Sequence, residues 1–342
     1  MTPDRKELSA RTEWGASATL LTGIDRRFLP GAFALFNSAR MNGFAGRFII
    51  GHFEPLDPAL CPAASGLSYE LLPEETPRPH HFVKRIDIML DREPGDYCCL
   101  DSDIVFERPC GFLLDGIEDG IVVSTEADQR YDPRDLWVRE QCRRAGVAWP
   151  LPPHPYVNVG LIGFRAPRDS AFLSRYSQTC RTLFADIDTK WGERFFPFTE
   201  QDVFNLFVRE RLAKGEGVAS ISHQRMELGV DCIARSGWDR PFPAERQTVR
   251  PSDIYRMLIH GASLRRPWLA ATAPGWRGKA EALGLLPWRR RRKGNLTPYE
   301  RAWAWYACSP GLPIDVEAWA PQFGFTAHRN RLWRSVFGLP PR

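Results

Sequence analysis

The pattern of apolar and polar positions predicts short buried strands that alternate with amphipathic helices. Apolar residues over 18–25 predict a first strand that leads into a loop, and Leu29 to Met41 show helical spacing. Further apolar runs predict strands at 48–51, 67–72, 121–124, 156–164, 217–222 and 254–260, and helical patterns cover 81–90, 132–145, 170–184 and a segment from 198 onward. This alternation predicts an α/β fold with a mostly parallel sheet.

The most informative stretch runs from Tyr97 to Phe106, directly after the turn residues 94–96. It is apolar except for Asp101, Ser102 and Asp103, so we expect a buried strand that ends in two carboxylates. Buried carboxylates need a partner or a metal ion, although a simple turn that caps the next segment would also use these residues. The apolar residues on both sides favour a divalent-metal site, because open α/β sheets bind ligands at the carboxyl ends of strands.

Three other polar positions have a structural and a functional interpretation. Asn158 lies inside an apolar run with Gly160, which predicts either a substrate contact or an edge strand with a bulge. The acids at 200 and 202 open a helix whose cap falls near Thr199 or Glu200, and the helix dipole alone would explain them. His260 ends a predicted strand, where a single histidine is usually structural.

Length and composition indicate a folded protein with one large domain. The chain has 342 residues, 43% hydrophobic and 25% charged, which excludes a disordered protein and allows one α/β domain with an appendage or two domains. Beyond Pro274 the composition shifts to Trp, Arg and Pro. We therefore expect an N-terminal extension at 1–16, a catalytic domain at 17–274 and a basic, aromatic region at 275–342.

The cysteines and apolar segments predict a cytoplasmic location. Eight cysteines are scattered without a Cys-x-x-Cys pair, so a zinc site or a disulfide framework is not expected and the thiols should be reduced and mostly buried. The first residues show no signal-peptide core, and no uninterrupted run of about 18 apolar residues occurs.

The positive charge is concentrated near the end of the chain. The run Arg289 to Lys293 follows Trp288, although the net charge of the whole chain is only +5. A basic and aromatic segment suits peripheral contact with an anionic membrane on the cytoplasmic side, or it is simply a solvated face. So short a basic run with little net charge behind it gives thin support for nucleic-acid binding.

Four motifs in order resemble the GT-A glycosyltransferases of family 8, the group of glycogenin and the bacterial lipooligosaccharide galactosyltransferases. They are Leu-Asp-Ser-Asp at 100–103, Asn-Val-Gly-Leu-Ile-Gly-Phe at 158–164, Glu-Gln-Asp-Val-Phe-Asn at 200–205 and His-Gly-Ala-Ser-Leu-Arg-Arg-Pro-Trp at 260–268. The resemblance implies a GT-A, Rossmann-like domain that binds a nucleotide sugar. It also implies metal-dependent transfer of a hexose from a UDP-sugar to a glycan or glycolipid in cell-surface polysaccharide or lipopolysaccharide synthesis, with retention at the anomeric carbon.

The same resemblance assigns residues to roles. Asp101 and Asp103 match the DxD pair and His260 the third ligand of Mn²⁺, with Mg²⁺ as the alternative. The residues that match contacts to the nucleotide and diphosphate are Thr22, Gly23, Asp25, Lys84, Ser102 and Arg266, and Arg85 competes with Lys84 for its place. Those expected to face the sugar are Asn158, Glu200, Gln201 and Asp202.

Some positions depart from the family pattern. Glu200 stands where the family usually has Asp, Arg266 where it often has Lys, and Ser263 where it usually has Gly. Two alternatives therefore remain open. One is an inverting transferase in which Glu200 or Asp202 acts as a general base. The other is a protein that binds nucleotide sugars without transferring them.

Overall fold

The computed structural model describes most of the predicted catalytic domain and two short parts of the C-terminal region. The described residues are 13–72, 81–130, 136–185, 195–225, 231–234, 256–260, 302–303, 305–307 and 311–316. The strands are β1 (Thr19–Ile24), β2 (Arg47–His52), β3 (Leu67–Leu71), β4 (Gly95–Leu100), β5 (Ile104–Phe106), β6 (Ile121–Arg130), β7 (Pro155–Ala166), β8 (Val218–Arg225), β9 (Asp231–Ala234) and β10 (Arg256–His260). The α-helices are α1 (Leu29–Met41), α2 (His81–Lys84), α3 (Phe112–Asp119), α4 (Leu136–Ala145), α5 (Ser170–Phe184) and α6 (Glu200–Ala213), with 3₁₀ turns η2 (Arg26–Phe28), η3 (Pro58–Leu60) and η4 (Arg85–Met89).

All the described strands join one sheet in the order β3-β2-β1-β4-β7-β6-β8-β9-β10-β5. The neighbouring strands β3, β2, β1 and β4 run parallel to one another. β7 is antiparallel to both of its neighbours, β4 and β6, and β6 runs parallel to β8. In the part of the sheet from β3 to β8, only β7 opposes the common direction. The predicted α/β class with a mostly parallel central sheet is confirmed.

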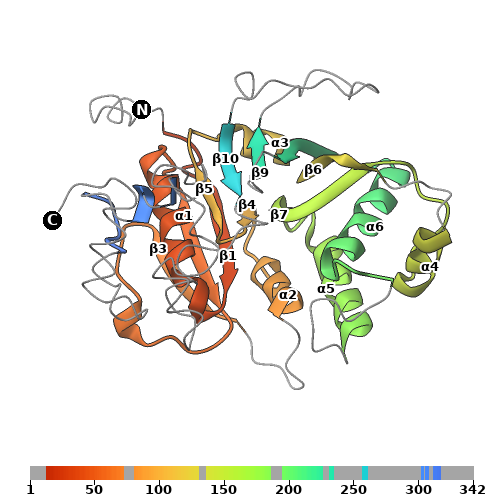
Figure 1. Cartoon of the computed structure of the whole chain (residues 1–342), viewed down its shortest axis with the longest axis horizontal. Helices are drawn as coiled ribbons and strands as arrows, with labels where there is room; N and C mark the ends of the chain where they lie inside the picture. The colour runs from red at the N-terminus through yellow and green to blue at the C-terminus, as the bar shows by residue number, and fades with distance from the viewer. Residues whose placement is uncertain are drawn as a thin grey trace, which may run out of the picture.

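Helices cover both faces of this sheet, so the core has two layers (Figure 1). Apolar residues of α1 and α3 pack on one face together with Leu20, Cys98 and Leu161. Those of η4, α4, α5 and α6 pack on the other face with Leu21, Cys99 and other strand residues. The alternation of side chains along β1 and β4 fixes this division, because successive residues of a strand point to opposite faces.

Part of the C-terminal region packs against α1, where Figure 1 draws it in blue beside that helix. Trp303, Tyr306 and Ile314 are buried in the core on this face. The side-chain amide of Asn37 in α1 donates to the carbonyl oxygens of Tyr306 and Ile314, each at 2.8 Å, and its oxygen accepts from the Ile314 N–H at 2.9 Å. This segment is therefore built into the first half of the sheet domain.

One prediction about the central strands is confirmed and one needs correction. The buried strand that ends in two carboxylates is β4, which ends at Leu100, and after the turn the chain forms β5, which pairs with β10. The edge-strand interpretation of Asn158 is wrong, because β7 lies between β4 and β6. The bulge that it included is present, since the pairing of β7 with β6 shifts register between Val123 and Ser124.

The described cysteines are mostly buried, as expected. Cys98, Cys99, Cys110, Cys142 and Cys180 are buried thiols, and Cys61 is partly exposed. Burial raises the pKa of the Cys98 and Cys99 thiols, so both stay protonated near neutral pH.

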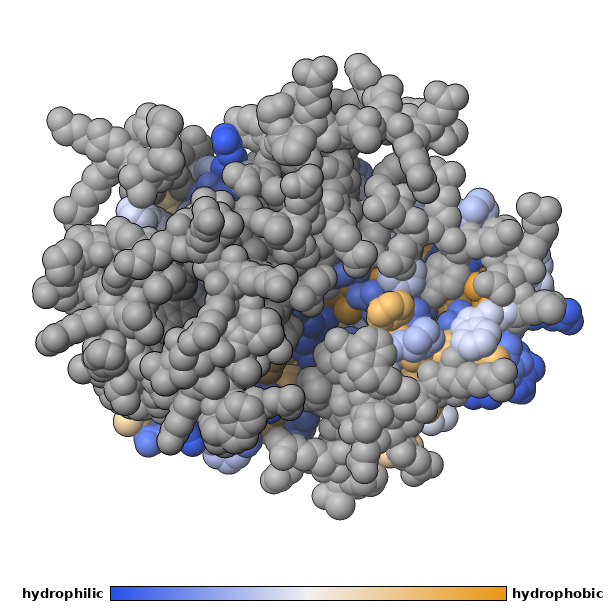
Figure 2. All heavy atoms as spheres, viewed as in Figure 1, coloured by the Kyte–Doolittle hydropathy of each residue, from blue (hydrophilic) through white to orange (hydrophobic). Residues whose placement is uncertain are grey.

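The surface has few large exposed apolar side chains among the described residues, namely Leu71, Trp137 and Phe198. Figure 2 shows hydrophobic residues interspersed with hydrophilic ones on the right of this face, over the helices of the second half of the sheet. Within the described part of the chain, every helix is too short or too polar to span a bilayer.

Candidate active site

Several of the described residues that were predicted for the site lie at the end of the sheet where β1 and β4 end and β7 begins. Backbone hydrogen bonds hold the turn after β4. The Asp101 N–H donates to the Gly160 carbonyl of β7 at 2.9 Å, and within the turn the Ile104 N–H donates to the Asp101 carbonyl at 3.0 Å. Asp103 is only 2% exposed, and Ser102 is buried as well. The turn therefore places two carboxylates beside the bulged part of β7.

Arg85, the first residue of η4, links this turn to β7. Its Nη1 donates to a carboxylate oxygen of Asp101, and its Nη2 donates to the Val159 carbonyl at 3.0 Å. Gly23 of β1 leaves room for it, because a Cβ there would lie 2.9 Å from the Arg85 Cγ. The start of η4 is thus fitted between β1, the turn and β7.

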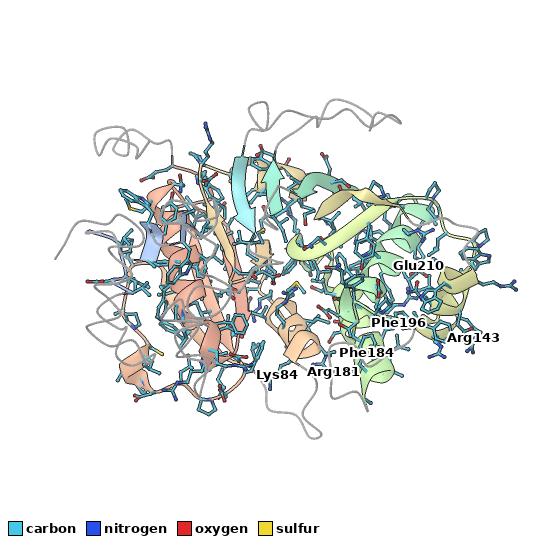
Figure 3. All side chains as sticks on the ribbon, viewed as in Figure 1. Lys84, Arg143, Arg181, Phe184, Phe196 and Glu210 are labelled. Carbon is cyan, nitrogen blue, oxygen red and sulfur yellow. The ribbon has the colours of Figure 1, made fainter. Side chains whose placement is uncertain are left out.

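A second ion pair connects η4 to α5. Arg181 of α5 donates to the carboxylate of Asp87, which is buried within η4. Figure 3 labels Arg181 and Lys84 in the middle of the molecule, between its two halves. Because Asp87 is tied to α5, the position of Arg85 does not depend on its contact with Asp101 alone.

The bulged part of β7 is bound to side chains of α6. Asn205 accepts from the Val157 N–H at 2.6 Å and donates to the Val157 carbonyl at 2.8 Å. Gln201 accepts from the Val159 N–H at 3.2 Å. β4 pairs with β7 only from Leu161 onward, so these residues lie where β7 extends past β4, and α6 supplies partners for their backbone groups.

Tyr156 connects the two polar residues of α6 that were predicted to face the sugar. Its hydroxyl donates to Asp202 at 2.8 Å and accepts from Gln201 Nε2 at 3.1 Å. The other Asp202 oxygen accepts from the Phe198 N–H at 2.8 Å. Both ends of the Gln201 amide and both Asp202 oxygens are therefore fixed by hydrogen bonds.

The helix that carries these residues begins with an unusual backbone conformation. Thr199 precedes α6 with φ of 47° and ψ of −115°, which is costly for a β-branched residue. Its hydroxyl donates to the carboxylate of Glu200, and the Tyr176 hydroxyl donates to the Glu200 carbonyl at 3.2 Å. Burial raises the pKa of Tyr176, so its hydroxyl keeps the proton that it donates. Strain of this kind is concentrated at functional sites.

Asn158 points its side chain back into the same strand. Its amide oxygen accepts from the Gly160 N–H at 2.9 Å, and its carbonyl accepts from the Ser124 hydroxyl at 2.8 Å. The residue is buried. Because Gly160 also receives the Asp101 N–H, Asn158 belongs to the network that begins at the Asp-Ser-Asp turn.

The predicted nucleotide loop at the end of β1 is divided between core and surface. Thr22 is 0% exposed, and its hydroxyl has no hydrogen-bond partner within the described part of the chain. Gly23 packs against Arg85, as described above. Asp25 caps η2 by accepting from the Arg27 N–H at 2.8 Å and forms an ion pair with the Arg27 guanidinium. Gly23 is therefore the residue of this loop with a contact to the network.

The proposed third metal ligand is placed by its backbone alone. His260 is the last residue of β10 and pairs with Ile104, the residue that follows Asp103. Its side chain and all of Arg266 lie outside the described residues. Among the described side chains, no three His, Cys, Asp or Glu residues form a cluster that could hold a metal ion.

Sequence reasoning did not identify several members of the network. Lys84 was assigned to the donor and is 1% exposed, whereas its neighbour Arg85 contacts Asp101. Tyr156 and Asn205 were not assigned at all, although Asn205 lies in a recognised motif and Tyr156 lies just before another. A tyrosine two residues before Asn158 and an asparagine one helical turn after Gln201 were the available signals.

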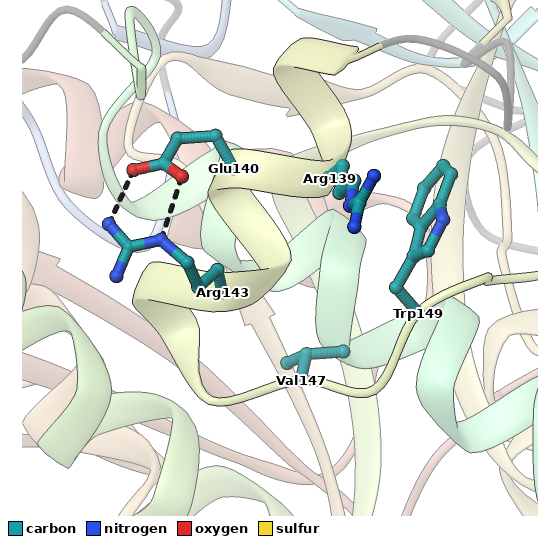
Figure 4. Close-up of a pocket in the computed structure, with 5 residues that line it drawn as sticks. All are labelled: Arg139, Glu140, Arg143, Val147 and Trp149. Atoms are coloured by element: carbon teal, nitrogen blue, oxygen red, sulfur yellow. Dashed lines mark hydrogen bonds and ion pairs between the residues drawn. The ribbon is translucent and has the colours of Figure 1, made fainter.

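A separate surface pocket of about 280 Å³ lies on α4 and the segment that follows it (Figure 4). It is lined by Arg139, Glu140, Arg143, Val147 and Trp149, and Figure 4 shows the Glu140 carboxylate paired with Arg143. Hydrogen bonds from Arg143 and Arg144 lower the pKa of Glu140 to about 2. None of the predicted site residues lines this pocket.

No protein-family model matches the chain, and no curated protein matches it either. Among solved structures, the chain is similar to the WbbM bifunctional glycosyltransferase in its apo form, with 12% identity and a TM-score of 0.38 over 60% of this chain and 39% of that one. It is also similar to the galactosyltransferase LgtC in complex with donor and acceptor sugar analogues, with 14% identity and a TM-score of 0.37 over 59% and 72%. A third is the glycosyltransferase GlyE of Streptococcus pneumoniae TIGR4, with 12% identity and a TM-score of 0.37 over 60% and 45%. The chain matches less than half the length of WbbM and GlyE.

Proposed function

We propose that this protein is a metal-dependent GT-A glycosyltransferase that moves a hexose from a nucleoside diphosphate sugar to a glycan or glycolipid. The observation that carries the proposal is the continuous hydrogen-bonded network from Arg85 and Asp101 through Gly160 and Val159 to Gln201. It brings three of the four sequence motifs together at the edge where an α/β sheet binds its ligands.

The residues at the Asp-Ser-Asp turn suit a divalent cation. Asp101 and Asp103 offer carboxylates from one turn, and the β5–β10 pairing puts the His260 backbone beside Ile104. Carboxylate and imidazole ligands together with phosphate oxygens are appropriate for Mn²⁺, with Mg²⁺ as the alternative. When bound, such a cation would neutralise negative charge on the departing diphosphate.

In the proposed reaction, the bond from the anomeric carbon to the diphosphate oxygen breaks and a bond from that carbon to an acceptor hydroxyl oxygen forms. The proton of the acceptor hydroxyl passes to the departing diphosphate oxygen, which has taken the electron pair of the broken bond, and positive charge develops at the anomeric carbon in the transition state. Glu200, Asp202 and the oxygen of Asn158 would stabilise this charge electrostatically. Such groups are most effective when their orientation is fixed beforehand, and the hydrogen bonds of Tyr156 and Thr199 supply that fixation.

Retention at the anomeric carbon is our proposal for the stereochemistry. Both Asp202 oxygens already accept hydrogen bonds, from Tyr156 and from the Phe198 N–H. These hydrogen bonds hold the carboxylate in one orientation, which suits an electrostatic role beside the anomeric carbon. Proton NMR of the product linkage distinguishes retention from inversion.

The further parts of the proposal concern substrates and setting. We propose a UDP-sugar as donor and an acceptor in the synthesis of a cell-surface polysaccharide or lipopolysaccharide at the cytoplasmic face of the membrane. The basic run Arg289 to Lys293 would contact anionic lipid there. Flotation with liposomes, with this run neutralised, tests the lipid contact separately from catalysis.

The deciding experiment uses a panel of nucleoside diphosphate sugars with and without Mn²⁺. Thermal unfolding and slow hydrolysis of the donor are measured for each sugar at several concentrations, because stabilisation appears only above the dissociation constant. We expect one UDP-sugar to raise the unfolding temperature and to be hydrolysed only when Mn²⁺ is present. A folded protein that responds to no nucleotide sugar contradicts the proposal.

A further inference from the structure

The network contains a positive charge at the position where a metal site would be expected to have only negative ones. The first carboxylate of the Asp-Ser-Asp turn is already paired with a guanidinium, and the side chains of Arg85 and Asp101 are only 15% and 23% exposed. An arginine side chain stays charged at all physiological pH values. A divalent cation at Asp101 would therefore approach a fixed positive charge as well as a negative one.

The arrangement around Arg85 keeps that charge in place. Gly23 of β1 packs so close to the Arg85 side chain that a Cβ on it would lie 2.9 Å from Cγ. The Val159 carbonyl accepts a hydrogen bond from Nη2 of Arg85. Asp87, in the same 3₁₀ turn, forms an ion pair with Arg181. A long surface side chain could swing away from an arriving cation at little cost, but this one would have to give up packing and a hydrogen bond. The positive charge is thus a permanent part of the site.

We propose that Arg85 makes the site discriminate against a bare divalent cation and in favour of a diphosphate or a cation–diphosphate complex. This inference rests on the proposed function and specifies what the site accepts. The guanidinium repels a free cation and competes with it for Asp101, and it attracts the negative diphosphate through charge-assisted hydrogen bonds. A complex of the metal ion with its diphosphate carries little net charge, so the guanidinium does not repel it.

The inference predicts opposite changes in two affinities when the charge is removed. In Arg85→Gln, the affinity for Mn²⁺ alone should rise at least about tenfold, whereas the affinity for UDP without any divalent ion should fall about tenfold. Arg85→Lys keeps the charge but not the two-nitrogen contact, so the affinity for Mn²⁺ should stay within about threefold of the wild type and the affinity for UDP should fall less than in Arg85→Gln. A loss of local structure would weaken both ligands together, so the opposite signs separate the two explanations.

The experiment measures Mn²⁺ binding by electron paramagnetic resonance and UDP binding by calorimetry on the full chain. Arg165→Gln is the matched control, because Arg165 pairs with Asp96 at the opposite end of the same two strands. Both affinities of this control should stay within about twofold of the wild type. Thermal unfolding of each variant shows that it is folded.

The outcomes separate this inference from the proposed function. If wild-type protein binds UDP with Mn²⁺ but Arg85→Gln binds Mn²⁺ no more tightly than wild type, the discrimination is wrong and the glycosyltransferase proposal stands. If wild-type protein binds neither UDP nor UDP with Mn²⁺, the proposed function itself fails. Parallel loss of both affinities in Arg85→Gln would make Arg85 a structural support for the turn and would also overturn the inference.

Discussion

The two ends of the β4–β7 pair carry the same ionic chemistry in different surroundings. At one end Asp96 and Arg165 face each other in register and form two hydrogen bonds, at 2.6 and 3.0 Å, with side chains 36% and 25% exposed for Arg165 and Asp96. At the other end Asp101 pairs with Arg85, which also holds the Val159 carbonyl and packs on Gly23. The Asp96–Arg165 pair joins two strands at the surface, whereas the Asp101–Arg85 pair belongs to a larger hydrogen-bonded network.

The difference between the ends lies in what surrounds the ion pair. An exposed pair between two strands contributes about 0–1 kcal/mol to stability, because water screens it. At the other end β4 stops at Leu100 while β7 extends past it, and Gln201 and Asn205 of α6 bind the backbone of the β7 residues that β4 does not pair with.

The largest contrast is expected between Asp103→Asn and Asp96→Asn. Asp103→Asn removes a buried carboxylate of the proposed metal site and should lower donor turnover at least about 10³-fold, equivalent to about 4 kcal/mol. Asp96→Asn should change turnover less than about twofold and the free energy of unfolding by about 1 kcal/mol or less. Donor hydrolysis and chemical denaturation check both variants. Unchanged turnover in a folded Asp103→Asn would remove the metal assignment.

A smaller contrast is expected between two tyrosines. Tyr156→Phe removes the hydroxyl that binds Asp202 and Gln201, so kcat should fall about 10–100-fold with a small change in KM, because groups fixed for the transition state lose their orientation. Tyr97→Phe, in β4 near Asp96, removes only a hydrogen bond to the Glu93 carbonyl. It should leave kcat unchanged. Steady-state kinetics distinguish the two, and equal effects on kcat would show that the network does not orient the site.

The smallest contrast is expected between two glycines. In Gly23→Ala the new Cβ meets Arg85 Cγ at 2.9 Å, and we expect about a 3–10-fold loss of UDP affinity as Arg85 is displaced. In Gly163→Ala the new Cβ meets Val122 Cβ at 2.9 Å, away from the site. That variant should lose about 1–3 kcal/mol of stability and keep its UDP affinity. Denaturation and calorimetry measure the two quantities. A stability loss without an affinity loss in Gly23→Ala would contradict the proposed role of Gly23.

The regular elements could be predicted from the sequence because local periodicity determines them. The helices at 29–41 and 170–184 begin and end where their apolar spacing and flanking residues indicate. The end of β4 at the two acids could be predicted, but the partner of β5 could not, because β5 pairs with β10, more than 150 residues later. Pairings between distant segments leave no periodic signal in the chain.

Within the site, sequence reasoning identified the motifs but not which of two neighbours serves them. Lys84 ends α2 and Arg85 begins η4, and consecutive residues of a helix point in directions roughly 100–120° apart. A shift of one residue in where α2 ends would exchange their roles. All the roles assigned to site residues stay predictions, including those of Lys84, Arg266 and the side chain of His260.

The contacts of Asn37 imply a delay between the synthesis of α1 and the burial of one of its faces. Its amide group holds the backbone of Tyr306, which lies 269 residues later in the chain. At a synthesis rate of roughly 5–20 residues per second, α1 leaves the ribosome about 10–50 s before its covering segment exists. During that interval the apolar surface that Trp303 and Ile314 later cover is open to water and to chaperones. The first half of the sheet is therefore synthesised well before this face of it is enclosed.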